Sequence, residues 1–484
     1  MAESLKQKTV KGVGWSFADN IANQGITFLV GLVLARLITP EEYGLIGIIL
    51  IFVAVFDSIV NCGFSNALIR KNDADDMDYN TVFIVNMVLS VVLFFAFFFS
   101  AQFIADFFGQ PLLKPLTQAM GSIVIIHAFA IIQRTVLIKR IDFKTQTKAS
   151  VISSVTSGVI GITMAFYGYG VWSLVAQQLS RALLNTVCLW IYSRWWPKLQ
   201  FSWNSFRELF GFGWKLLVSS LIDTVWREIY QVVIGKCYAP ATLGQYTRAH
   251  QFGSIFSSNL TSVIQRVSYP VLSNLQDDKE RMKEGYRRVI KLTMLVTFVL
   301  MLGLAVVSKP MIQVLVGDQW LIAADFLPII CLQMMLYPLH SLNLNMLQVQ
   351  GRSDLFLKLE IIKKCVAIIP ITLGIFVGIY WMIWGSVFTG MFAYYLNSYY
   401  SGKFLNYSIL TQIKDILPSF GIAVVMATVT YALSLLPLSP FILLPMQVMA
   451  GAGITVALCE RFKRPEYLEI RSMALSVLCK IKKK

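Results

Sequence analysis

The strongest constraint on this chain is a series of long apolar segments separated by short polar connections. A helix that crosses the hydrocarbon core of a bilayer needs about 20 mainly apolar residues, and such segments follow one another along most of the 484 residues. Only 14% of the residues are charged, whereas a typical soluble domain has about 25%. Because so little charge cannot cover a water-soluble surface, lipid must be part of the solvent, and the backbone that meets lipid must be helical.

We predict an all-α membrane protein with about 14 transmembrane helices. The first apolar segment follows three lysines but contains several polar residues, so it is typical of a retained span rather than of a cleaved secretory signal. The predicted spans are residues 12–38, 44–69, 79–107, 116–138, 149–167, 171–193, 211–237, 251–272, 289–307, 323–350, 359–377, 382–404, 413–436 and 441–460.

Lysine and arginine are distributed unevenly between the connections. Basic clusters lie before the first span, after every even-numbered span up to the twelfth, and at the end of the chain, while the other connections are nearly free of positive charge. Basic connections face the cytoplasm. The alternation therefore predicts an even number of spans with both termini cytoplasmic, and it accounts for the net charge of +16 without a nucleic-acid partner.

The seven cysteines and three histidines form no recognisable short motif. No two cysteines have the CxxC spacing, and the histidines lie far apart in the sequence. We therefore predict no disulfide, no metal site, no cofactor and no catalytic residue.

Three short motifs recur with an offset of about 200 residues, as internal repeats do. GVGW at residues 12–15 recurs as GFGW at 211–214, PEEYG at 40–44 as PATLG at 240–244, and FYG at 166–168 as FVG at 376–378. The alternative is chance matching of glycines and aromatic residues, which three collinear matches make improbable. We predict two pseudo-symmetric six-helix lobes, residues 1–208 and 209–405, followed by residues 406–484 with two further helices and a basic cytoplasmic tail.

Polar residues inside the spans indicate where a transported molecule would be held. A charged side chain at the bilayer centre costs about 3 kcal/mol, so such groups should face a protein interior or a hydrated cavity. The simpler alternative, hydrogen bonding between helices at about 0.6 kcal/mol per contact, is preferred for single serines and amides. Arginine instead favours a functional role because its planar donors match phosphate.

The candidate substrate-binding residues are Arg134, Arg181, Arg227, Arg266, Asn23, Asn61, Gln177, Gln265, His127 and His340. The candidate acids, which either pair with these groups or couple transport to an ion, are Asp19, Asp57, Asp223 and Glu228. Asp223 and Arg227 are four residues apart and are expected to be able to pair.

Several segments resemble the Wzx-type polysaccharide flippases of the multidrug/oligosaccharidyl-lipid/polysaccharide exporter superfamily, which also contains the MATE drug exporters. These segments are KGVGWS at residues 11–16, LARLITPEEYG at 34–44, GFSNALIR at 63–70 and GFGW at 211–214. The resemblance covers the whole chain and implies a MATE-like fold. It also implies a substrate: an oligosaccharide repeat unit of lipopolysaccharide, O-antigen, capsule or exopolysaccharide, linked to undecaprenyl diphosphate.

The resemblance further implies that two lobes open alternately to the two sides of a bacterial cytoplasmic membrane. Membrane lipids, a polysaccharide polymerase and glycosyltransferases are the expected partners, and we expect a monomer. The alternatives are an ion-coupled drug or cation antiporter on the same fold, a membrane-embedded glycosyl polymerase or ligase, and a flippase for the peptidoglycan lipid precursor. The polymerase or ligase would need a sizeable outer loop with catalytic residues, and the predicted outer loops are short.

Overall fold

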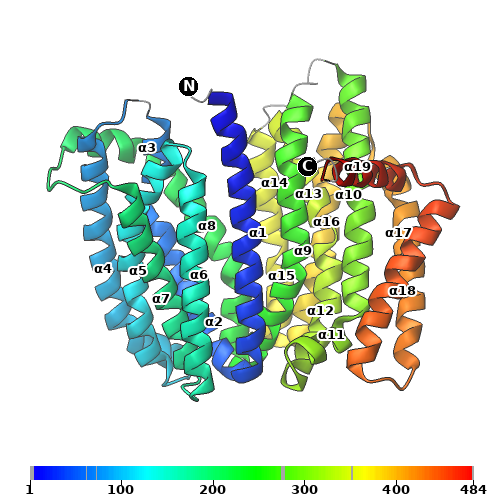
Figure 1. The fold of residues 1–484 in the computed structure, drawn as a ribbon, viewed down its shortest axis with the longest axis horizontal. Helices are drawn as coiled ribbons and strands as arrows, with labels where there is room; N and C mark the ends of the chain where they lie inside the picture. The colour runs from blue at the N-terminus through cyan, green and yellow to red at the C-terminus, as the bar shows by residue number, and fades with distance from the viewer. Residues whose placement is uncertain (1–4, 62, 72, 274–277, 350–352, 482–484) are drawn as a thin grey trace. The chain divides into compact units, whose positions relative to one another are not determined.

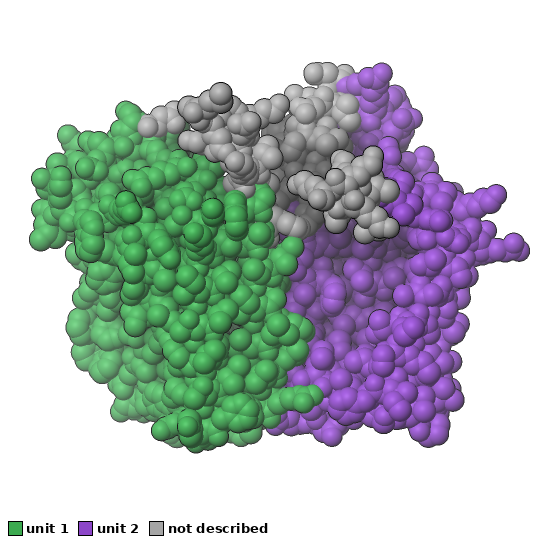
Figure 2. Space-filling view, viewed as in Figure 1, with its two compact units in different colours: residues 1–244 green, residues 245–484 purple. Residues whose placement is uncertain are grey.

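The structure is a computed structural model that describes residues 5–61, 63–71, 73–273, 278–349 and 353–481. Within these ranges the regular structure is entirely helical (Figure 1). The contacts divide the chain into two compact units, residues 1–244 and 245–484, which Figure 2 distinguishes by colour.

The described part of the first unit contains eight helices and the start of a ninth. They are α1 (Leu5–Leu37), α2 (Pro40–Asn61), α3 (Phe64–Arg70), α4 (Asp76–Phe108), α5 (Leu113–Lys139), α6 (Phe143–Phe166), α7 (Val171–Ser193), α8 (Trp203–Cys237) and α9 (Pro240–Ser273). In this unit α6 packs between α1 and α7, while α5 packs against α2, α4 and α7.

The second unit contains the rest of α9 and the helices that follow it. They are α10 (Lys279–Val306), α11 (Ser308–Leu315), the short 3-10 helix η1 (Asp318–Trp320), α12 (Leu321–Met334), α13 (Tyr337–Val349), α14 (Ser353–Val366), α15 (Ile368–Phe376), α16 (Ile379–Leu405), α17 (Ile409–Ala432), η2 (Leu433–Leu435), α18 (Pro440–Arg461) and α19 (Pro465–Ile481). Here α10 packs against α12 and α17, and α13 packs against α16.

The helix boundaries follow local sequence signals. A capping box between Asp75 and Asp78 opens α4, and Asp142 and Ser408 cap α6 and α17. Gly63 has φ 67°, so the predicted span 44–69 is divided into α2 and α3 at this left-handed residue. The predicted spans 323–350 and 359–377 are likewise each divided into two consecutive helices.

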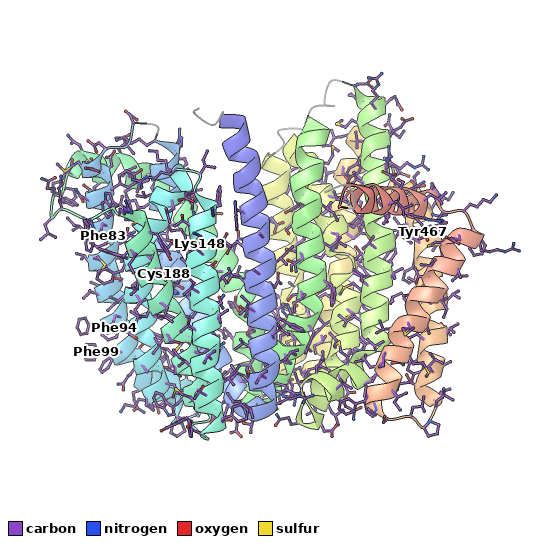
Figure 3. All side chains as sticks on the ribbon, viewed as in Figure 1. Phe83, Phe94, Phe99, Lys148, Cys188 and Tyr467 are labelled. Atoms are coloured by element: carbon purple, nitrogen blue, oxygen red, sulfur yellow. The ribbon has the colours of Figure 1, made fainter. Side chains whose placement is uncertain are left out.

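Many helices present apolar side chains that the rest of the protein leaves largely exposed. On α4, Phe99 is 75% exposed and Phe103 is 71% exposed, and Figure 3 shows Phe99 projecting away from the helix bundle. Nine helical segments of the described residues are long and apolar enough to cross a membrane. The chain is therefore a multi-pass all-α membrane protein, as predicted; every predicted span lies on one helix or on two consecutive helices, while the number 14 stays a prediction.

The predicted lobe boundary is not tested by these contacts. The division after Gly244 groups α8, the first helix of the second predicted lobe, with α2, α3 and α4. The residues after 460, predicted as a basic tail, include the helix α19. This helix, which carries Tyr467 (Figure 3), packs on its unit through Tyr467 and Ile470. An ion pair between Glu469 and Arg288 adds a second contact.

Candidate functional site

The first unit encloses a polar cavity of about 600 Å³ between α1, α2, α5, α6 and α7. A second space of about 320 Å³ shares Asp57, His127 and Arg134 with it and adds Asn61. The polar side chains that line the larger cavity are Asp19, Asn23, Asp57, His127, Arg134, Gln146, Ser150, Ser153, Gln178, Arg181 and Asn185.

Helical spacing explains why these side chains converge. Asp19 and Asn23 are four residues apart on α1, and His127 and Arg134 are seven apart on α5. Residues separated by three, four or seven positions share one face of a helix. Each helix therefore turns a polar stripe inward and leaves its apolar positions for packing and lipid.

One group of these residues joins α1 to α6. Asn23 Nδ2 donates to Asp19 Oδ1 and to Ser150 Oγ, both at 2.7 Å, and Ser154 Oγ donates to Asn23 Oδ1 at 2.7 Å. The Ser150 hydroxyl donates in turn to Asp19. The carboxylate of Asp19 thus accepts hydrogen bonds from neutral side chains. This network of hydrogen bonds holds the two helices together.

A second group joins α2 to α5. His127 Nδ1 lies 2.9 Å from Asp57 Oδ1 and 2.8 Å from Asp57 Oδ2. An imidazole N–H that donates to a carboxylate at this distance makes a strong, charge-assisted hydrogen bond. The carboxylate of Asp57, like that of Asp19, therefore has a hydrogen-bond donor beside it.

The two cavity arginines differ from the two carboxylates in their hydrogen bonding. Arg134 is exposed to the cavity and Arg181 is half-buried beside it. Within the described residues neither guanidinium makes a hydrogen bond or ion pair, although Asp19 and Asp57 act on Arg134 electrostatically. A guanidinium offers five N–H donors in a planar fork, so both groups are available to an anion that enters the cavity.

Three amide side chains complete the lining near these arginines. Gln178 and Asn185 lie three residues before and four residues after Arg181 on α7. Gln146 on α6 also lines the cavity, and its Nε2 is buried with no hydrogen-bond partner among the described residues. The cavity therefore combines two cationic groups with amide donors and acceptors.

A second charged pocket of this unit has a different character. Arg70, Lys71, Asp73 and Glu208 line a space of about 410 Å³ near the end of α3. Lys71 Nζ lies 2.9 Å from Glu208 and 3.0 Å from Asp78, and these hydrogen bonds raise the pKa of Lys71. Lys71 therefore already holds two counter-charges, unlike the arginines of the larger cavity.

The predicted residues of α8 lie apart from the cavity. Arg227 Nε donates to Glu228 Oε1 at 3.0 Å, and Gln231 Nε2 donates to Glu228 Oε2. Asp223 is exposed on the same helix. Arg227 thus forms an ion pair with Glu228, the next residue in the chain.

The remaining predicted residues lie in the second unit or on α9. Gln265 donates to Ser341, and the ring of His340 lies 6.4 Å from that of Tyr394. His340 Nδ1 is buried without a hydrogen-bond partner in the part of the chain that the structure describes. The side chain of Arg266 lies outside the described residues.

The structure replaces Gln177 with Gln178 as a cavity residue. Gln177 packs against α6, where it would touch a β-carbon at Gly161, and it is absent from the cavity lining. Consecutive residues of a helix point about 100° apart, so only one of these two glutamines can face the cavity. The sequence alone cannot choose between them, because it contains no neighbouring helix to fix the rotation of α7.

The contribution of α6 is missing from the sequence prediction. Gln146, Ser150 and Ser153 have the spacing of a single helical face, which is a readable signal. The predicted span begins at residue 149, because the sequence before it contains two lysines, so Gln146 is excluded. A polar stripe that continues beyond the apolar segment is the sequence signal that identifies α6 as one side of the cavity.

Comparison with known proteins gives relatives in polysaccharide biosynthesis. The chain is 26% identical over 333 residues to the succinoglycan biosynthesis transport protein ExoT of Rhizobium meliloti (strain 1021), covering 69% of this chain and 67% of that protein. It is 24% identical over 380 residues to the lipopolysaccharide biosynthesis protein WzxC of Escherichia coli (strain K12), covering 77% and 76%.

Solved structures share the fold. The lipid II flippase MurJ in an inward closed conformation aligns with a TM-score of 0.73 at 17% identity, covering 94% of this chain and 99% of MurJ. An inward-facing MATE multidrug transporter aligns with a TM-score of 0.59 at 14% identity, covering 83% and 98%. These likenesses confirm the predicted MATE-like fold.

The family match agrees with the resemblance in the sequence. The family described as polysaccharide biosynthesis protein matches residues 33–325, which include the cavity helices α2, α5, α6 and α7. Because this match covers more than half of the chain, the protein belongs to the polysaccharide biosynthesis protein family.

Proposed function

We propose that this protein is a flippase that moves an oligosaccharide linked to undecaprenyl diphosphate across a bacterial cytoplasmic membrane by alternating access. The observation that carries the proposal is the pair of arginines, Arg134 and Arg181, which line one polar cavity without ion-pair partners among the described residues. The fold and the family supply the transport context.

The charge arrangement fits an anion whose charge is fixed. The two arginines and the two aspartates of the cavity balance formally, but neutral donors and His127 already engage the aspartates. A diphosphate diester brings two negative charges that cannot enter hydrocarbon unaided, and guanidinium groups replace its hydration with directed hydrogen bonds. The prenyl chain itself stays in the lipid.

The amide groups fit the sugar part of the same molecule. Gln146, Gln178 and Asn185 present donors and acceptors toward the cavity, as hydroxyl and acetamido groups require. The names of ExoT, a succinoglycan biosynthesis transport protein, and WzxC, a lipopolysaccharide biosynthesis protein, support a glycan cargo. A cationic drug, the substrate of the alternative antiporter, would instead meet two guanidinium groups that have no ion-pair partner among the described residues.

The proposal includes the finer points that the sequence predicted. The two six-helix lobes rock against each other, both termini lie in the cytoplasm, and the glycan assembled by glycosyltransferases is delivered to a polymerase on the outer face. Arg227, Arg266, Gln265 and His340 belong to later positions along the route rather than to the cavity of the first unit. The chain acts as a monomer.

Complementation of a strain that lacks this protein tests the function. Arg134→Ala and Arg181→Ala should each abolish surface glycan while the protein remains in the membrane at normal amount, and the double variant should accumulate lipid-linked oligosaccharide. Lys substitutions should restore part of the activity because they keep the charge. Full complementation by the double alanine variant would exclude the proposed anion site.

A further inference from the structure

Two copies of the repeated Pro-x-x-x-Gly segment lie against each other in the first unit. Pro40–Gly44 opens α2 and Pro240–Gly244 opens α9, each after a connection of two residues. A β-carbon at Gly44 would overlap the carbonyl group of Pro240, and a β-carbon at Gly244 would overlap the carbonyl oxygen of Pro40. We call this reciprocal contact, formed by Pro40, Gly44, Pro240 and Gly244, the glycine crossing.

The crossing requires glycine on both sides. A β-carbon added to Gly44 would also lie 3.1 Å from Pro240 Cα, and one added to Gly244 would lie 3.2 Å from Gly44 N. These neighbours are backbone atoms, which cannot move aside as a flexible side chain would. Any side chain at either position would therefore hold the first turns of α2 and α9 apart.

Side chains next to the two glycines fasten the crossing to different helices. Glu42 Oε1 accepts a hydrogen bond from Val171 N at 2.9 Å, which ties the start of α2 to the start of α7. Gln245, the residue after Gly244, donates to Gln319 O at 2.6 Å and accepts from Ala323 N at 2.9 Å. The start of α2 is thus fixed within the first unit, whereas α9 is tied to η1 and α12 one residue beyond the crossing.

The crossing lies at the joined end of the hairpin formed by α1 and α2, and the polar residues of the cavity lie farther along both helices. Asp57 lies 17 residues beyond Pro40 on α2, which is about 25 Å along a helix. Asp19 and Asn23 lie 18 and 14 residues before Leu37, the last residue of α1. A contact at one end of the hairpin can therefore close that end while the cavity communicates with the other.

We propose that the glycine crossing is the outer gate of the transport path, an inference that rests on the proposed flippase function. When Gly44 and Gly244 are in contact the outer end is shut, and separation of the two first turns opens it. A contact between bare backbone surfaces has no interlocking side chains to withdraw, so it can part and re-form with little rearrangement. The two copies of the motif share the proline and the glycine that shape the crossing, even though Glu42 is replaced by Thr242.

Cross-linking of the two first turns distinguishes a gate from a fixed joint. In a variant with the exposed Cys237 and Cys365 replaced by Ser, Glu41→Cys and Ala241→Cys would be bridged by a short bifunctional thiol reagent with a reducible disulfide. The bridge should reduce glycan flipping at least tenfold, and reduction should restore it. Continued flipping by the bridged protein would overturn the gate, because the crossing would then be a joint that never opens.

Substitution at the glycines gives a readout that needs no substrate. In intact spheroplasts, Asn185→Cys in the cavity would be labelled by a membrane-impermeant maleimide from outside. Gly44→Ala or Gly244→Ala should raise the labelling rate about tenfold, whereas Gly14→Ala and Gly25→Ala, where nothing lies within 4 Å of the added carbon, should not. Equal labelling in all four would overturn the gate. Raised labelling, together with an absence of glycan transport by the protein that carries none of these substitutions, would retain the gate but reject the proposed substrate.

Discussion

Polar residues have different roles in the two units. In the first unit, polar stripes on five helices surround a cavity of about 600 Å³, and two arginines there lack ion-pair partners among the described residues. In the second unit, Tyr286 donates to Asn343 at 2.9 Å, Tyr407 donates to Asp415 at 2.8 Å, and Lys291 lies 3.1 Å from Asp415. Polar residues therefore line an open cavity in one unit and form an internal brace in the other.

This contrast means that the number of polar residues in a span does not reveal their role. What separates the two roles is whether each charged group is satisfied by its neighbours. Asp415 also accepts hydrogen bonds from Arg287, so its charge is opposed by two cations. Arg134 and Arg181 instead retain donors for a molecule from outside. Substitutions in the brace and in the cavity should therefore differ in kind, with the greatest loss of stability in the brace.

Replacement of Asp415 by Ala should destabilise the protein most. The change removes the acceptor of Arg287, Lys291 and Tyr407 and leaves two neighbouring cations without their counter-charge. We expect a loss of about 2 kcal/mol, measured as thermal or denaturant unfolding in detergent, because hydrogen bonds to a charged group contribute about 1.5–3 kcal/mol and the side chains of Arg287 and Lys291 are 46% and 27% exposed. A variant as stable as the parent protein would show that the brace contributes nothing.

Replacement of Arg134 or Arg181 by Ala should lower anion affinity without lowering stability. A hydrogen bond to a charged group contributes about 1.5–3 kcal/mol, so the affinity for a symmetrical dialkyl diphosphate should fall about 10- to 100-fold for each change. Calorimetry on protein in lipid nanodiscs measures this. Arg227→Ala, whose guanidinium is already paired with Glu228, is the matched control and should change the affinity by about twofold at most.

Replacement of Asn23 by Ala should have a moderate effect on stability. The change removes the links from α1 to Ser150 and Ser154 on α6, and hydrogen bonds between membrane helices contribute about 0.6 kcal/mol each. We therefore expect a loss of about 1 kcal/mol in the same unfolding experiment. If the unfolding midpoint were unaltered and transport lost, Asn23 would contact the cargo rather than brace the helices.

The adjacent glutamines of α7 offer the finest test. Gln178→Ala should reduce the affinity for a glycan diphosphate about three- to tenfold, the range of a neutral hydrogen bond, whereas Gln177→Ala should leave it unchanged because that side chain packs against α6. Binding of a soluble sugar diphosphate, compared between the two variants, measures the difference. The reverse order would mean that α7 turns its other face to the cavity.

The class of protein and most of the helices could be predicted from the amino-acid sequence. Scarce charge and apolar segments of spanning length leave helices in lipid as the only solution, and the recurring GxGW and Pro-x-x-x-Gly motifs indicate the repeat. Arg134, Arg181, Asp19 and Asp57 were also recognisable, because an ionisable residue inside a span must face an interior.

What these side chains do depends on packing that the sequence pattern does not contain. The rotation of α7 selects Gln178 over Gln177, the packing of α6 on α1 adds Gln146 and Ser150, and Glu228 rather than a more distant acid takes the ion pair of Arg227. Periodicity fixes which residues share a face of one helix, but it carries no information about which neighbour that face meets. The partners of a buried charge, and hence its freedom to bind a ligand, are set by contacts between segments far apart in the sequence.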